Sequence, residues 1–167
     1  MPSTKPEINT ADITERLVGI TPAYLNNFLQ RKLFGLRASV RPGKLRKKHR
    51  LFSREDVFGI ALVWLLFEVG LRTDPIRRVV KDISGESKGD ANLAAKKLRE
   101  EQAQWVEVSR SPRVPAKTPS DKPEQVTRIL GEQDHIDWFA QSDIKLFIPV
   151  GKKFKDVQHR LELLFGE

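Results

Sequence analysis

A dense apolar run lies between Ser53 and Gly70. The thirteen residues from Val57 to Val69 include only one charged side chain, Glu68. This run is too short to cross a bilayer, which needs about 20 apolar residues. Its apolar side chains surround the helix instead of forming one stripe, which predicts burial on most sides. Because Ser53 is a favourable N-cap residue and Gly70 a favourable terminator, we expect a central core helix between them.

Two short helices are predicted before this core helix. The first covers residues 10–17 and places Ile13 and Leu17 four positions apart on one face. After a glycine turn, Thr21 as N-cap and Pro22 at the first helical position begin a second helix. This second helix is expected to run to about residue 32.

The second helix has an apolar face and a polar face. The apolar face holds Leu25, Phe28, Leu29 and Leu33, and the opposite face holds Ala23, Asn26, Asn27 and Gln30. A short helix, a glycine turn and a second helix with outward carboxamides are typical of a helix-turn-helix motif. Asn and Gln are the side chains that pair bidentately with adenine in the major groove. Many small helical hairpins share this pattern, so a purely structural hairpin is the alternative.

A basic segment joins the second helix to the core helix. Residues 31–50 contain nine Lys or Arg and no Asp or Glu. The pair Pro42-Gly43 is a strong turn signal between two segments that favour extended structure, which predicts a small two-stranded wing. Cations on such a wing would neutralise phosphates and set affinity and register, but not sequence. The basic residues on or near this wing are Arg37, Arg41, Lys44, Arg46, Lys47, Lys48 and Arg50.

The positive charge is confined to the first half of the chain. Residues 1–83 hold 16 Lys or Arg and 8 Asp or Glu, whereas residues 84–167 hold 14 of each. The whole net charge of +8 therefore lies in the first half. We expect an anionic partner to bind there. The alternative is a basic surface that serves solubility.

The second half predicts a mixture of short helices and strands. Prolines at 112, 115, 119 and 123, with Ser, Thr and Lys between them, indicate a linker or long surface loop. In the final helix Phe154, Val157, Leu161 and Leu164 recur at helical spacing, which suits packing on a local sheet, a dimer contact or both. We expect helices at 73–83, 91–104 and 152–165, strands at 105–109, 125–130 and 145–150, and a turn or short helix at 135–140.

Several kinds of chemistry find no support in the sequence. The chain has no cysteine, which excludes disulfides and thiolate metal sites. No glycine-rich phosphate loop or nucleophile elbow is present, and the group Asp134-His135-x-Asp137 with Asp143 is more typical of a solvated segment than of a metal site. We therefore expect no enzymatic activity, no cofactor and no bound metal. The start of the chain lacks the apolar region of a secretory signal, so a cytoplasmic location is expected.

The order of these features resembles the winged helix-turn-helix head of the MerR family of bacterial transcription regulators. The passage from His49 to Val57 is similar to the family's Tyr-Arg-hydrophobic-Tyr-Ser-x-x-Asp-hydrophobic, and Gly70 to Ile76 is similar to its entry into a fourth helix. The resemblance covers about residues 8–83. It implies a DNA-binding homodimer that controls transcription, with RNA polymerase as a further partner.

This chain departs from the family pattern in the second helix. The family's Leu-Arg-Tyr-Tyr is replaced by Leu25-Asn26-Asn27-Phe28, so the arginine and first tyrosine that contact DNA in the family are asparagines here. Arg50 keeps the family's wing arginine, and His49 replaces the neighbouring tyrosine. The resemblance therefore implies DNA binding but not the family's usual promoter geometry.

Together these patterns predict an α+β chain with a mostly helical winged helix-turn-helix domain at 8–83 and a small α+β domain at 91–167. The expected function is sequence-specific binding of double-stranded DNA in transcription control. The alternatives are an adaptor that docks its basic wing on an acidic protein, and an accessory factor that bends DNA in recombination. The candidate DNA-contacting residues are Thr21, Tyr24, Asn26, Asn27, Gln30, Arg31, Arg37, Arg41, Lys44, Arg46, Lys47, Lys48, His49 and Arg50.

Overall fold

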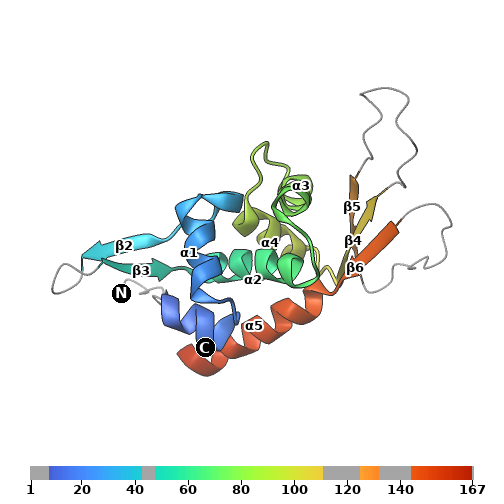
Figure 1. Cartoon of the computed structure of the whole chain (residues 1–167). Helices are drawn as coiled ribbons and strands as arrows, with labels where there is room; N and C mark the ends of the chain where they lie inside the picture. Colours follow the sequence, from blue (N-terminus) through green and yellow to red (C-terminus); the bar gives the residue numbers. More distant parts are fainter. Residues whose placement is uncertain (1–7, 43–47, 111–124, 132–143, 167) are drawn as a thin grey trace.

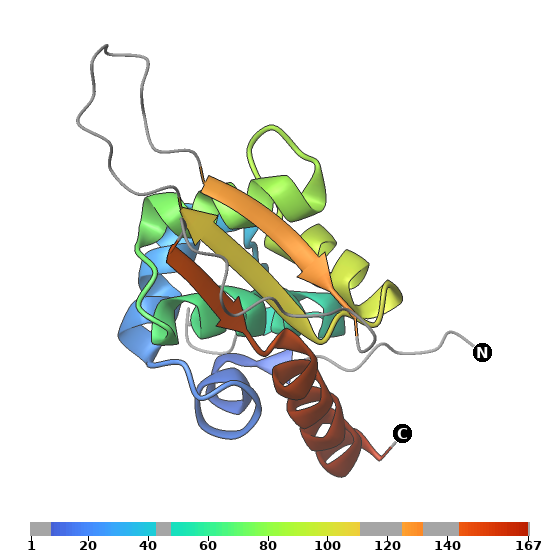
Figure 2. The same ribbon diagram turned by 90° about the vertical axis from the view of Figure 1, so that its right-hand side faces the viewer.

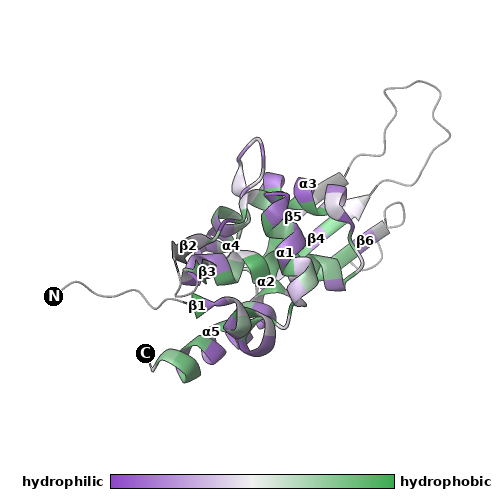
Figure 3. Ribbon diagram, turned by 60° about the vertical axis from the view of Figure 1, so that its left-hand side comes forward, coloured by the Kyte–Doolittle hydropathy of each residue, from purple (hydrophilic) through white to green (hydrophobic). Residues whose placement is uncertain are grey.

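Helix α2 (Arg54–Glu68) lies at the centre of the fold and confirms the predicted core helix. Its first turn is closed by a capping box: the Ser53 hydroxyl oxygen accepts a hydrogen bond from the Asp56 amide at 3.2 Å, and the Asp56 carboxylate accepts one from the Ser53 amide at 2.8 Å. Nearly every residue from Val57 to Leu66 is buried. Figure 3 shows this apolar helix surrounded by the other elements.

The computed structural model describes residues 8–42, 48–110, 125–131 and 144–166. The fold is mixed α+β, with helices grouped around α2 and two small sheets at opposite ends of the molecule (Figure 1). The remaining elements are β1 (Ile8–Asn9), the π-helical turn η1 (Asp12–Leu17), α1 (Pro22–Gln30), the 3-10 turn η2 (Leu33–Gly35), β2 (Ser39–Pro42), β3 (Lys48–Phe52), α3 (Thr73–Ser84), α4 (Ala91–Glu100), β4 (Trp105–Arg110), β5 (Gln125–Leu130), β6 (Ile144–Ile148) and α5 (Val150–Phe165).

The first sheet has the strand order β1-β3-β2, and both pairings are antiparallel. Strands β2 and β3 form the predicted two-stranded hairpin, with Val40 opposite Arg50. Strand β1 was not predicted, and it extends the hairpin by pairing Ile8 with Phe52. Both residues are buried, so this pairing attaches the base of the hairpin to the core.

The second sheet has the order β5-β4-β6, again antiparallel, with β4 in the centre. Figure 2 shows its three strands side by side in front of the helices. Val106 lies opposite Ile129 on one side and Ile148 on the other, and these three residues belong to the apolar face that packs on the core. The three strands predicted in the second half are thus confirmed, with small changes in their bounds.

Some predicted helix ends are wrong. The helix predicted at 73–83 begins at Thr73 as expected and extends one residue further, to Ser84, although its N-cap residue, Arg72, makes no side-chain capping bond. The helix expected to reach residue 104 ends at Glu100, because Gln102 adopts a left-handed conformation with φ of 51° and redirects the chain into β4. The final helix starts at Val150, two residues earlier than predicted.

Helix α5 packs mainly on elements from the beginning of the chain. Its residues Phe154, Val157 and Leu161 are buried, and it contacts α2 and η1 as well as β4. The Arg160 guanidinium donates hydrogen bonds to the carbonyls of Arg16 and Leu17, at 3.3 and 3.4 Å. Three of the four apolar residues predicted to recur along this helix are therefore buried within the chain. They pack on other helices as well as on the local sheet. Leu164, the fourth of these residues, is 37% exposed.

The buried residues form one hydrophobic cluster that extends from Ile8 to Leu161. Both predicted domains contribute to it, and their division stays a prediction. The proline-rich segment 111–123, the turn at 135–140 and the group formed by Asp134, His135, Asp137 and Asp143 lie outside the described residues. Within the described part of the chain, no helix combines the length and the apolar character needed to cross a membrane.

The close contact at the start of α5 leads to a stability prediction. The Gly151 amide donates to the Gln104 carbonyl at 3.1 Å, and a Cβ atom on Gly151 would lie 2.9 Å from the Ala103 carbonyl oxygen. We expect Gly151→Ala to lower the free energy of unfolding by about 1–3 kcal/mol despite the better helix propensity of alanine. Urea denaturation measures this change, and Lys152→Ala at the exposed neighbouring position should stay within about 0.5 kcal/mol of the parent. A Gly151→Ala chain as stable as the parent would contradict the close contact.

Candidate nucleic-acid interface

The core holds helix α1 in place through its apolar side. Leu25 and Phe28 are buried, and the Phe28 ring centroid lies 5.8 Å from those of both Phe34 and Phe67. As predicted, the Thr21 hydroxyl caps α1, accepting a hydrogen bond from the Tyr24 amide at 3.5 Å. With its apolar side fixed in this way, α1 presents its polar side away from the core.

The polar side of α1 carries two carboxamides, Asn27 and Gln30, without a hydrogen-bond partner among the described residues. Asn27 is half-buried, and Gln30 and Arg31 are exposed. Within the described part of the chain, no residue is hydrogen-bonded to the side chain of Asn27 or of Gln30. Both amides therefore keep the donor and the acceptor that a bidentate contact with a base edge requires.

Asn26 is placed differently from the other two carboxamides. Its Oδ1 accepts a hydrogen bond from the Arg50 Nη1, which joins α1 to strand β3. This bond uses one of the two lone pairs of the oxygen with which Asn26 would accept from adenine, and it fixes the direction of the amide. The base contact of Asn26 stays a prediction, and in this structure its side chain accepts a hydrogen bond from an arginine of the hairpin.

A groove of about 510 Å³ lies between the end of α1 and the base of the β2–β3 hairpin. We call it the basic groove. Leu29, Leu36 and Ala38 supply its apolar part, and none of the described residues that line it carries a carboxylate. A cleft lined by one sign of charge concentrates ions of the opposite sign. Its polar lining consists of Gln30, Lys32, Arg37 and Arg50.

Lys32 was absent from the residues predicted by sequence. It lies two residues after the end of α1 and adopts a left-handed conformation with φ of 50°, and Phe34 does the same with φ of 58°. These two residues turn the chain sharply after α1 and bring Lys32 and Arg37 to the same groove. The basic run at 31–50 was the sequence signal for this region. It could not show that Lys32, among several basic residues, lines the groove.

Tyr24 contacts the aromatic side of α2 and is not among the groove's lining residues. It is 42% exposed, and its ring centroid lies 5.4 Å from those of both Trp64 and Phe67. The exposed side of α1 is therefore bordered by the hairpin at Asn26 and by these aromatic rings at Tyr24.

The rest of the predicted interface is described only in part. Arg41 lies opposite His49 near the far end of the hairpin, and Lys48 pairs with Pro42. For these positions the structure describes the backbone but not the side chains. Lys44, Arg46 and Lys47 lie outside the described residues. The phosphate contacts predicted for all of these residues stay predictions.

Residues 8–42, 48–110, 125–131 and 144–166 contain no group of three His, Asp or Glu side chains placed to hold a metal ion. The expectation that the chain has no catalytic or metal site stays a prediction. Comparison with known proteins adds no further assignment: the chain matches no protein-family model, and none of the curated proteins matches it in sequence.

Proposed function

We propose that this chain is a transcription regulator that binds double-stranded DNA with sequence preference. In this proposal residues 8–83 form a winged helix-turn-helix domain. Helix α1 enters the major groove of the DNA, and the β2–β3 hairpin lies along the phosphate backbone. The observation that carries it is the basic groove at the end of α1, where three cations and the Gln30 carboxamide line the same cleft. A homodimer would read two half-sites, and RNA polymerase would be a further partner.

Separate residues are proposed to give affinity and specificity. Lys32, Arg37 and Arg50 line the groove without any described carboxylate among them, so phosphate oxygens are suitable counter-charges. Asn27 and Gln30 carry the free amides and would contact base edges. Cations that hold the backbone and amides that read bases are the two kinds of contact that a specific DNA-binding protein needs.

Asn26 is proposed to orient Arg50. An arginine side chain has five N–H donors, and the hydrogen bond to the Asn26 Oδ1 uses one of them while fixing the direction of the guanidinium. The remaining donors can then bind a phosphate with less loss of side-chain entropy. Asn26 therefore acts on DNA through Arg50 and is a positioning residue.

The first prediction concerns the salt dependence of binding. We expect the whole chain to bind a random-sequence duplex at low salt, with log K falling linearly as log salt rises. Lys32→Gln should weaken binding to every sequence alike and reduce this slope by about one unit. Fluorescence anisotropy measures both effects, and Lys81→Gln on the exposed side of α3 is the matched control that should leave them unchanged. Failure to bind even at low salt would overturn the proposal and favour the adaptor alternative.

The second prediction concerns sequence preference. After selection of a preferred duplex from a random pool, Asn27→Ala should reduce discrimination at one base pair by about 1–3 kcal/mol. Affinity for random duplex should change little, because the groove cations are retained. Competition titrations against single-base variants of the selected duplex test this. A uniform loss over all variants would mean that Asn27 does not face the bases.

The third prediction separates positioning from base reading at Asn26. We expect Asn26→Ala to weaken binding about three- to tenfold on all sequences, because Arg50 loses its fixed orientation. In an Arg50→Ala background the same change should have little further effect, since interacting residues are not additive. Anisotropy on the four chains of this double-mutant cycle provides the test. An effect at one base pair that persists without Arg50 would identify Asn26 as a base reader.

A further inference from the structure

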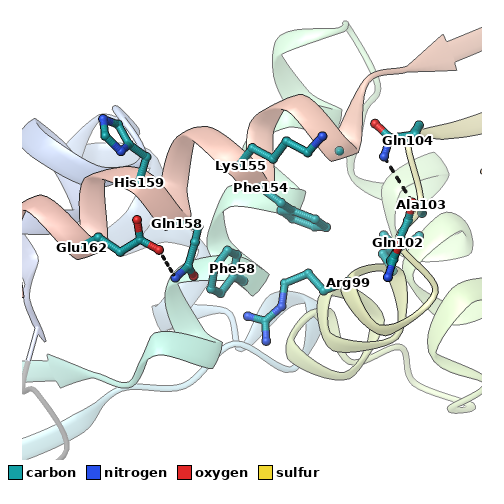
Figure 4. Close-up of a pocket in the computed structure, with 12 residues that line it drawn as sticks. Phe58, Arg99, Gln102, Ala103, Gln104, Phe154, Lys155, Gln158, His159 and Glu162 are labelled. Carbon is teal, nitrogen blue, oxygen red and sulfur yellow. Dashed lines mark hydrogen bonds between the residues drawn. The ribbon is translucent and has the colours of Figure 1, made fainter. Parts of the chain in front are cut away.

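A second groove, of about 490 Å³, lies where α5 crosses α2 and the end of α4 (Figure 4). None of its lining residues belongs to the basic groove or to α1. Its volume is within the range of about 300–1,000 Å³ that is usual for small-molecule sites. Three helices from separate parts of the chain meet here, so the groove exists only in the folded protein.

The floor of this groove is aromatic. The rings of Phe58 on α2 and Phe154 on α5 meet edge to face, with their centroids 5.7 Å apart. The guanidinium carbon of Arg99 lies 4.0 Å from the centre of the Phe58 ring, which is a cation–π contact. A planar apolar group placed in the groove would therefore meet ring surfaces and the flat side of a guanidinium.

The described lining of the groove includes two basic side chains and one carboxylate. Arg99 on α4 and Lys155 on α5 both line it, and neither forms an ion pair with any residue that the structure describes. The lining carboxylate, Glu162, lies seven residues beyond Lys155 on α5, which is about 10 Å along a helix. It already accepts a hydrogen bond from the Gln158 Nε2 at 2.8 Å. Arg99 and Lys155 are therefore the lining residues suited to an anion.

We propose that this groove binds a small organic anion with a planar apolar body. The aromatic floor would hold the ring of the ligand, and Arg99 and Lys155 would bind its carboxylate or a similar group. The two cations make an anion the complementary ligand, and the limited volume of the groove favours a compact molecule over a longer acidic peptide. This proposal does not depend on DNA binding.

The test compares a charged probe with a neutral probe of the same shape. We expect naphthalene-2-carboxylate to bind the full chain at least about tenfold more tightly than naphthalene-2-methanol, because only the carboxylate forms charge-assisted contacts. Titration calorimetry and ligand-observed NMR measure both affinities. Equal binding of the two probes, or no binding of the carboxylate at millimolar concentration, would overturn the proposal.

Variants then locate the probe. Arg99→Met retains an apolar stem over Phe58 and removes the charge, so it should weaken carboxylate binding about tenfold and leave alcohol binding unchanged. Lys155→Gln should act in the same direction, and Lys152→Gln, exposed on the same helix but outside the groove, is the matched control. Equal affinities of the Lys155→Gln and Lys152→Gln chains would place the probe elsewhere and contradict the proposal. Tighter binding of an acidic peptide than of the carboxylate would replace it with a peptide site.

Discussion

Burial of α2 on almost every side is the constraint on which the rest of this structure depends. A helix that is apolar all round cannot be covered by one partner, so α4, α5 and the aromatic side of α1 all pack against it. Gly59 allows α4 to come close, because a Cβ there would lie 2.1 Å from the Asn92 Oδ1. The Asn92 Nδ2 in turn donates to the Asp56 carboxylate at 2.6 Å, which joins α4 to the cap of α2.

Both grooves are consequences of how α2 is covered. Strand β3 ends at the buried residue Phe52, directly before the Ser53 cap, so the start of α2 determines where the hairpin leaves the core. The hairpin then forms the basic groove with the end of α1. At the opposite end of the chain, α5 returns to cover α2, and its crossing with α4 forms the second groove. The same core thus supports two grooves with different linings.

Local sequence signals were sufficient for much of the fold. The Ser53 N-cap, the Thr21-Pro22 helix start and the helix predicted at 73–83 each depend on neighbours within a few positions, and all three helices are present. The two strands that the Pro42-Gly43 turn signal was predicted to join are present, with β2 ending at Pro42 and β3 beginning at Lys48. Helix ends were less certain, because the left-handed Gln102 that ends α4 is of a residue type with no preference for that conformation.

The amino-acid sequence by itself determined the core helix, the helix caps, most strands and the concentration of positive charge in residues 31–50. Only the tertiary structure decided that α5 packs on α2 and η1, that Asn26 holds Arg50, and that Lys32 joins the basic groove. The physical reason is that periodicity shows which face of an element is apolar but not which distant element covers it. A hydrogen bond between residues 24 positions apart likewise leaves no local pattern in the sequence.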